Sequence, residues 1–129
     1  MSLKIDSLDH LVLTVRDPGA TCDFYARVMG CAVVRFGEGR TALNFGRQKI
    51  NLHEAGRELA LRAERPTPGS GDMCFLTVTP MDEVLRHLDA CGVAVIERPV
   101  TRAGATGEIL SVYFRDPDRN LIEVSNVVA

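Results

Sequence analysis

The sequence predicts an α+β domain built from two βαβββ modules. Three observations lead to this fold class: an internal repeat, two helices that start at proline, and short β-rich runs between turns. The apolar stretch at 9–15 aligns one to one with the stretch at 72–78, at an offset of 63. A recurring order of elements indicates one supersecondary unit present twice. We expect a single domain over residues 1–129, with modules at about 5–54 and 71–127, a linker at about 55–70, and a curved mixed sheet that forms a cup.

The first module follows from standard local signals. After the strand at 9–15, Asp17 is expected to cap a helix at about 18–29, with Pro18 in its first turn and Gly30 at its end. Beyond the helix, β-rich runs separated by turns predict a strand meander at 31–36, 41–45 and 49–53.

The second module repeats this order. Its strand at 72–78 leads to a helix at about 80–91, which we expect Thr79 to cap before Pro80. The β-rich runs that follow lie at 93–96, 109–114 and 121–125. The glycine-containing segment 99–108 is expected to be a mobile loop that could close over a site.

Composition narrows the classes of partner. The chain has 129 residues, 46% of them hydrophobic, and 15 basic against 17 acidic residues that are scattered along it. This balance argues against nucleic acid and anionic membranes as partners. No apolar run is long enough to span a bilayer and the first residues do not resemble a signal peptide, so a cytoplasmic protein is expected. The four cysteines form no CxxC pair, and we expect them to be reduced.

Equivalent positions of the two modules predict a metal site. If the first and last strand of each module contribute one residue, the pairs are His10 with Met73 and His53 with Glu123. Histidine nitrogen and carboxylate oxygen bind divalent metals, whereas a thioether is a poor ligand, so an ion held by His10, His53 and Glu123 would keep open positions. Each histidine could instead be an ordinary core or edge residue. The carboxylate could pair with an arginine of the 115–119 turn.

The same residues resemble a known family. The Asp-His pair at 9–10, the Asn-Leu-His-Glu stretch at 51–54 and, above all, the Tyr-Phe-Arg-Asp-Pro-Asp-Arg-Asn-Leu-Ile-Glu stretch at 113–123 resemble the vicinal oxygen chelate superfamily. That superfamily includes glyoxalase I, fosfomycin-resistance proteins and extradiol dioxygenases. More narrowly, the stretches at 45–54 and 122–126 are similar to the subfamily of glyoxalase domain-containing protein 5.

The resemblance implies a glyoxalase-like fold, commonly a homodimer, and one divalent metal ion (Zn, Ni, Mn or Fe) that chelates two neighbouring oxygens of a small-molecule substrate. The modules could pair within one chain or between two. Glyoxalase-like lyase or isomerase chemistry is favoured, and an extradiol-type ring-cleaving dioxygenase is the alternative, because two histidines and a carboxylate also match non-haem iron sites. A binding protein that sequesters a small molecule without catalysis also stays open.

Roles for single residues complete these expectations. Glu123 and Tyr113 are the predicted catalytic groups, since a carboxylate or a phenol at the metal can transfer protons. The predicted substrate contacts are Arg102, which would hold an anionic group, together with Met73 and Phe45.

Overall fold

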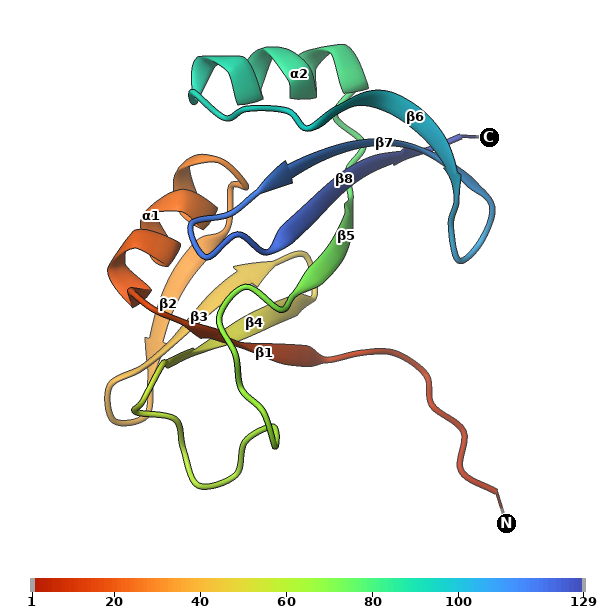
Figure 1. The fold of residues 1–129 in the computed structure, drawn as a ribbon. Coiled ribbons are helices and arrows are strands. Elements are labelled where there is room, and N and C mark those ends of the chain that lie inside the picture. Colours follow the sequence, from red (N-terminus) through yellow and green to blue (C-terminus); the bar gives the residue numbers. More distant parts are fainter. Residues whose placement is uncertain (1, 129) are drawn as a thin grey trace. The chain divides into compact units, whose positions relative to one another are not determined.

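The fold is seen in a computed structural model that describes residues 2–128. The chain divides into two compact units, Met1–Thr67 and Pro68–Ala129, and each unit has its own sheet and helix (Figure 1). Within the described residues, no helix is long and apolar enough to cross a membrane.

The first unit contains one helix and a four-stranded sheet. Its elements are β1 (His10–Val15), α1 (Pro18–Arg27), β2 (Ala32–Phe36), β3 (Arg40–Phe45) and β4 (Gln48–Glu54). The strand order is β1-β4-β3-β2, with β1 parallel to β4 and the other neighbours antiparallel. A parallel pair needs a long connection, and here α1, β2 and β3 supply it.

The second unit repeats this arrangement. Its elements are β5 (Asp72–Leu76), α2 (Met81–Ala90), β6 (Glu97–Ala103), β7 (Glu108–Arg115) and β8 (Leu121–Val127). The strand order is β5-β8-β7-β6, again with a parallel first pair. The predicted α+β class with two βαβββ modules is therefore confirmed for the described residues.

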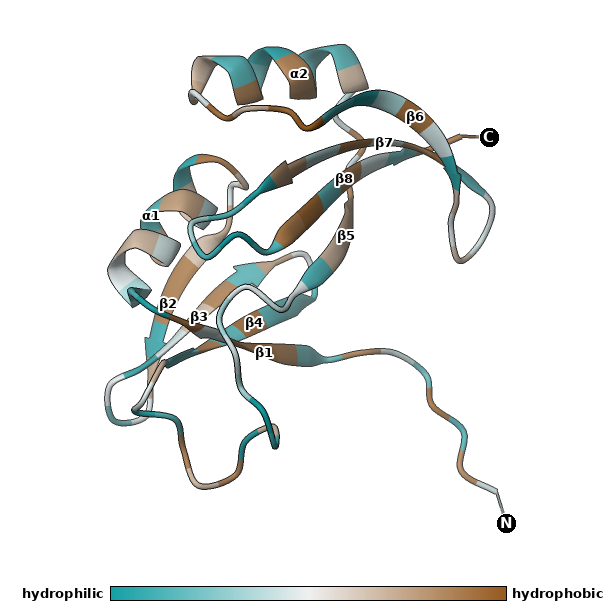
Figure 2. Ribbon diagram, in the orientation of Figure 1, coloured by the Kyte–Doolittle hydropathy of each residue, from teal (hydrophilic) through white to brown (hydrophobic). Residues whose placement is uncertain are grey.

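Hydrophobic and hydrophilic residues both occur along the strands of each sheet (Figure 2). Successive side chains of a strand point to opposite sides, and the burial of the strands' residues gives each sheet an apolar face and a more polar face. In the first unit, the apolar face includes the buried residues Leu13, Leu43 and Ile50. Helix α1 contacts β2, β3 and β4, and it buries Phe24 and Tyr25. The opposite face of this sheet is left for polar residues of β1 and β4.

The second sheet shows the same division. Its apolar face carries Val112 and Phe114 of β7 with Ile122 and Val124 of β8, all of them buried. The other face carries the alternate residues of the same two strands. These alternate residues include Tyr113 and Glu123, two residues of the second unit's predicted site.

Strand β6 corrects two sequence expectations. Residues 93–96, predicted to be a strand, are irregular, and the predicted mobile loop at 99–108 is largely a strand that pairs with β7. The sequence of 97–103 gives no strand signal because it is charged and contains Pro99, which cannot donate a backbone hydrogen bond to a neighbouring strand. The register shifts between Glu97 and Val100, so Pro99 lies where the pairing is interrupted at the edge of the sheet.

The two helices begin differently. The Asp17 side chain accepts hydrogen bonds from the backbone N–H groups of Gly19 (3.0 Å) and Ala20 (3.2 Å), so the predicted cap of α1 is confirmed. Helix α2 starts after Pro80 and has no side-chain cap, so the predicted Thr79 cap is wrong. The backbone N–H of Thr79 instead donates to the Thr77 hydroxyl, 3.1 Å away.

The turn between β7 and β8 explains much of the 113–123 motif. Buried Asp116 accepts hydrogen bonds from the backbone N–H groups of Asp118 and Asn120, and its second oxygen accepts from Asn120 Nδ2 at 2.8 Å. The Asn120 Oδ1 atom accepts from the Gly71 N–H at 2.7 Å, just before β5 begins. These polar residues therefore fix the entry of β8 next to β5, which is a structural role.

Candidate functional site

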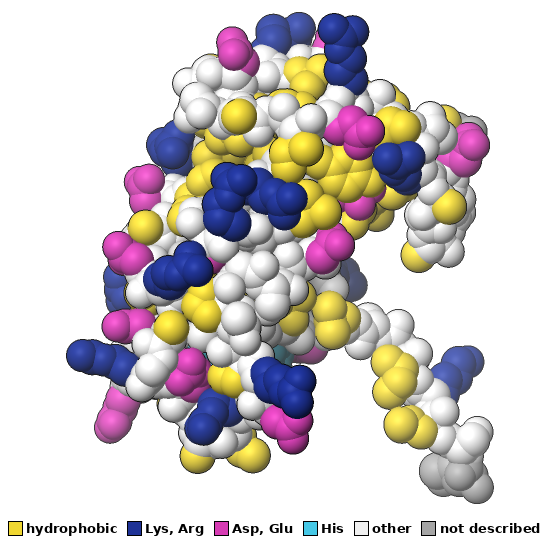
Figure 3. Space-filling view, viewed as in Figure 1, with side chains coloured by type: hydrophobic (Ala, Val, Ile, Leu, Met, Phe, Trp, Pro, Cys, Tyr) yellow, Lys and Arg dark blue, Asp and Glu magenta, His cyan; other side chains and the backbone are white. Residues whose placement is uncertain are grey.

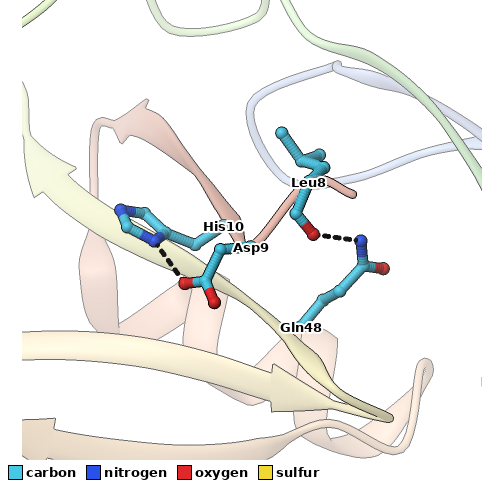
Figure 4. A network of polar contacts seen from close by, with 4 residues as sticks. All are labelled: Leu8, Asp9, His10 and Gln48. Atoms are coloured by element: carbon cyan, nitrogen blue, oxygen red, sulfur yellow. Dashed lines mark hydrogen bonds and ion pairs between the residues drawn. The ribbon is translucent and has the colours of Figure 1, made fainter. Parts of the chain in front are cut away.

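His10 lies at the start of β1 and carries a carboxylate partner. Its Nδ1 atom is 2.9 Å from Asp9 Oδ2, and its side chain is 43% exposed (Figure 4). Gln48 Nε2 donates to the Leu8 carbonyl at 2.8 Å and ties the chain just before this pair to β4. A carboxylate on Nδ1 leaves Nε2 available, which is the arrangement typical of metal-bound histidine.

Two side chains of β4 are buried with polar atoms that lack a partner. Asn51 is 4% exposed and His53 is 8% exposed. Within the described residues, Asn51 Oδ1 and His53 Nδ1 have no hydrogen-bond partner. The two residues are two positions apart and so point to the same face of the sheet. Buried polar atoms are normally satisfied, so this face is suited to hold a further polar or charged group.

The β1–β4 register separates the two predicted histidine ligands. His10 is opposite Lys49, whereas His53 is opposite Thr14. Four residues of strand span about 13 Å, so the structure does not bring His10 and His53 side by side. Asn51 is two residues beyond Lys49, the partner of His10, and lies on the same face. It is therefore nearer to His10 than His53 is.

Glu123 is held by a buried pair of serines. The Ser111 hydroxyl donates to Glu123 Oε2 at 2.5 Å, and the Ser111 and Ser125 hydroxyl oxygens are 2.7 Å apart. Both serines are completely buried. Tyr113 is the direct cross-strand partner of Glu123, so the structure brings the two predicted catalytic residues together on one face.

Met73 does not share this face. Its partner in β8 is Ile122, whereas Cys74 is opposite Glu123. The Cys74 sulfur is 3.3 Å from the Ser125 hydroxyl. Burial raises the pKa of the Cys74 thiol, and the nearby Glu123 carboxylate also raises it. Met73 therefore points to the apolar side of its sheet, and its place in the site stays a prediction.

The last strands of the two units can be matched by sequence, Ile-Asn-Leu at 50–52 to Ile-Glu-Val at 122–124, which makes Asn51 the counterpart of Glu123. Their partners on the first strands, Val12 and Cys74, then correspond as well. Two residues before Val12 and Cys74 lie His10 and Asp72, which are likewise counterparts. The sequence pairing of His10 with Met73 differs from this match by one residue on the first strands, and the pairing of His53 with Glu123 differs by two residues on the last strands. The match between Ile-Asn-Leu at 50–52 and Ile-Glu-Val at 122–124 was the signal that could have found Asn51.

The other two predicted substrate contacts, Arg102 and Phe45, lie in different surroundings. Arg102 Nε donates to the Tyr113 hydroxyl at 3.2 Å, and its Nη2 is 3.5 Å from Glu97 Oε2. Arg102 therefore belongs to the Tyr113 and Glu123 neighbourhood, with its charge already matched. Asn44 is opposite Lys49, which is opposite His10, so Asn44 lies on the His10 face. Phe45 is the next residue along the strand and therefore points to the other face. Its predicted substrate contact stays a prediction.

The site residues come in pairs rather than in a ready cluster. Among residues 2–128 there is no group of three or more His, Cys, Asp or Glu side chains that could hold a metal ion. The first unit offers His10 with Asn51, and the second offers Asp72 with Glu123. Each pair consists of a first-strand residue and a last-strand residue on one face.

Comparison with known proteins identifies the family of this chain. The family model of the Glyoxalase/Bleomycin resistance protein/Dioxygenase superfamily matches residues 7–124. The chain belongs to this superfamily. The family resemblance inferred from the 113–123 motif is thereby confirmed.

Two relatives in the superfamily are similar over nearly the whole chain. Virulence protein STM3117 of Salmonella typhimurium is 53% identical over 128 residues, which cover 99% of this chain and 89% of the relative. Glyoxalase domain-containing protein RDO1 of Mycosarcoma maydis is 52% identical over 124 residues, which cover 96% of this chain and 70% of the relative.

Solved structures of the superfamily agree. The crystal structure of the Salmonella protein matches with a TM-score of 0.96 at 52% identity, covering 98% of this chain and 100% of the other. Lactoylglutathione lyase from Agrobacterium tumefaciens matches with a TM-score of 0.72 at 26% identity, covering 95% of this chain and 94% of the other. The two-module fold is thus shared with both of these solved structures.

Proposed function

We propose that this chain is a metal-dependent enzyme of the vicinal oxygen chelate type, acting on a small oxygen-bearing substrate by lyase or isomerase chemistry. The observation that carries the proposal is the polar face of the first sheet. There, the carboxylate-backed His10 shares a face with two buried atoms that lack partners, on Asn51 and His53. The 26% identical lactoylglutathione lyase supports the choice of reaction class.

The proposed ligands of one divalent ion are His10, Glu123 and a donor from β4. His53 is the β4 ligand expected from the sequence, and Asn51 is the one that the register favours. Asp72 is proposed as the fourth donor because it is the counterpart of His10. One imidazole among oxygen donors suits manganese or ferrous iron better than a sulfur-rich or all-histidine set would, while zinc and nickel also accept such ligands.

The chain's own groups define how a proton would move. A bound divalent ion supplies Lewis-acid polarisation of two neighbouring substrate oxygens. Glu123 is the proposed base: the Ser111 hydroxyl occupies Oε2, which leaves Oε1 to accept a proton. The Tyr113 hydroxyl accepts a hydrogen bond from Arg102, so its own proton can be donated to a substrate oxygen.

Ring-cleaving dioxygenation is the second candidate, and the geometry ranks it lower. It would use two histidines and one carboxylate on one ion. His10 and His53 are four register positions apart, so they do not form such a set side by side. A binder without catalysis would show no turnover with any substrate class.

The proposal includes a homodimer. Strands β1 and β5 each lie at an edge of their own sheet, and their side chains Val12 and Leu76 are 44% and 62% exposed. Exposed apolar edges are normally covered by a partner. Light scattering should give twice the chain mass of 14.1 kDa, and a monomer at all concentrations would contradict this part of the proposal.

Substitution of the donors tests the metal site. Mn²⁺ affinity, measured by electron paramagnetic resonance, should fall at least about 100-fold in His10→Ala and Glu123→Ala, because each loses a ligand. Comparing Asn51→Ala with His53→Ala decides which residue is the β4 ligand. His87→Ala, which removes the histidine of α2, is the control and should bind as wild type does. Unchanged affinity in both His10→Ala and Glu123→Ala would overturn the site.

The reaction class is tested with the metal-loaded protein. Adducts of thiols with α-ketoaldehydes, epoxides with thiols, and catechols with dioxygen represent the three chemistries. Turnover of the first class, abolished in Glu123→Gln, is the expected result. Catechol cleavage would instead favour the dioxygenase, and no turnover with any class would favour a binding protein.

A further inference from the structure

Two cations on the first sheet converge on one aromatic ring without an acidic partner. The Lys49 Nζ atom is 4.2 Å from the centroid of the Phe36 ring, and the Arg40 guanidinium carbon is 4.6 Å from the same centroid. Within residues 2–128 neither cation forms a salt bridge. The ring attracts both charges, but the charges repel each other.

This arrangement contrasts with that of Arg102. Arg102 was the residue expected to hold an anionic group, yet its guanidinium already contacts the Glu97 carboxylate and the Tyr113 hydroxyl. Arg40 and Lys49, by contrast, contact the same ring and have no carboxylate partner among residues 2–128. An anion bound between them would offset the repulsion between the two positive charges, which the neutral Phe36 ring does not cancel.

The cation pair lies on the proposed metal-binding face. Lys49 is opposite His10, and its side chain extends from there to the Phe36 ring. Phe36 is opposite Arg40, and two residues earlier Val34 is opposite Ala42, so these four side chains share one face. Ala42 is in turn opposite Asn51, which extends this face to β4. Phe36, Arg40 and Lys49 therefore point to the same side as His10 and Asn51.

General attraction for anions does not account for this cluster. The chain has a net charge of -2, and acidic and basic side chains are interspersed on the face drawn in Figure 3. A local pair of unmatched cations stands out against that background. Both side chains are half-buried, which strengthens their interaction with an anion relative to a fully solvated position.

We propose that Arg40 of β3 and Lys49 of β4, which both contact the Phe36 ring, bind an anionic oxyacid group (phosphate or carboxylate) of the substrate. This inference rests on the proposed function, because it names the substrate class of the same site. The substrate then has two parts. One presents neighbouring oxygens to the metal ligands, and the other carries the negative charge.

The test separates anion binding from metal binding. Metal-free protein is titrated with inorganic phosphate and with acetate, and binding is followed through the backbone amide signals of residues 36, 40 and 49. The same samples are titrated with Mn²⁺. Wild type should bind at least one of the two anions, and Lys49→Gln and Arg40→Gln should each weaken that binding at least fivefold while leaving Mn²⁺ affinity unchanged.

Arg35→Gln is the matched control. It removes the same charge from the same sheet, but Arg35 alternates with Phe36 and contacts the Thr41 hydroxyl on the other face. Anion affinity in this variant should equal that of wild type. Failure of both anions to bind, or an equal loss in all three variants, would overturn the inference. If Mn²⁺ fails to bind wild type while the anion binds as described, the proposed function fails and the anion site stands.

Discussion

Glu123 depends on Ser111 for its orientation. The Ser111 hydroxyl bonds one carboxylate oxygen at 2.5 Å, and Ser111 is in turn bonded to Ser125. Groups that orient a metal ligand contribute to affinity without touching the ion. Ser111 therefore belongs to the proposed site although it is not an expected ligand.

Ser111→Ala tests this positioning role. We expect Mn²⁺ affinity to fall about 10-fold, because partners of metal ligands typically contribute 10-fold to 100-fold. Ser125→Ala is the control, since Ser125 is equally buried but has no direct bond to Glu123. Equal Mn²⁺ affinities in the two variants would show that the Ser111 bond does not orient the carboxylate.

Cys31 illustrates how burial controls reactivity. Burial raises the pKa of its thiol from 9.0 to about 11. At neutral pH the folded protein should thus contain about 100-fold less Cys31 thiolate than the unfolded chain, and the thiolate is the reactive form. Alkylation of Cys31 by iodoacetamide, followed by mass spectrometry, should be correspondingly slower in the native protein than in urea. The native rate should rise with pH until about pH 11, and a rate equal to that of the unfolded chain would contradict the assignment.

Among the elements, the two helices offer a comparison within one molecule. Helix α1 has a side-chain cap at Asp17, whereas α2 begins after Pro80 without one. Asp82 and Glu83 occupy the first turn of α2, where acidic residues interact favourably with the helix dipole. The helices are thus stabilised at their starts by different means.

Asp17→Ala should lower the free energy of unfolding by about 1 kcal/mol, because two backbone N–H groups lose their acceptor. Thr79→Ala should change it by less than about 0.5 kcal/mol, since Thr79 does not cap α2. Urea denaturation of both variants measures the difference. Similar losses in the two would show that the cap geometry does not decide helix stability here.

The elements with strong local signals were predictable, and those without were not. Helices that begin near proline and end near glycine agree with the structure to within a few residues, as do the strands of the β3–β4 hairpin. Strand β6 was missed because Pro99 and its charged neighbours read as a loop. Only the tertiary pairing with β7, which starts at Glu97 opposite Tyr113, makes this segment a strand.

For the whole molecule, the repeat predicted the right architecture, and the site residues stay a prediction. Sequence alignment of the first strands put Met73 in step with His10, whereas matching 50–52 to 122–124 and following the parallel registers puts Asp72 there. A shift of one residue exchanges the two faces of a strand, so it replaces every candidate on it. Glu123 and Tyr113 were both named from the 113–123 motif, and the structure places them opposite each other on β8 and β7.

The central claim is that the chain binds one divalent metal ion. The direct measurement is elemental analysis of protein purified without chelator or affinity nickel, before and after incubation with manganese, ferrous iron, nickel or zinc. We expect about one ion per chain in wild type. A wild type that stays empty after incubation with each of the four metals would contradict the claim and favour a metal-free binding protein.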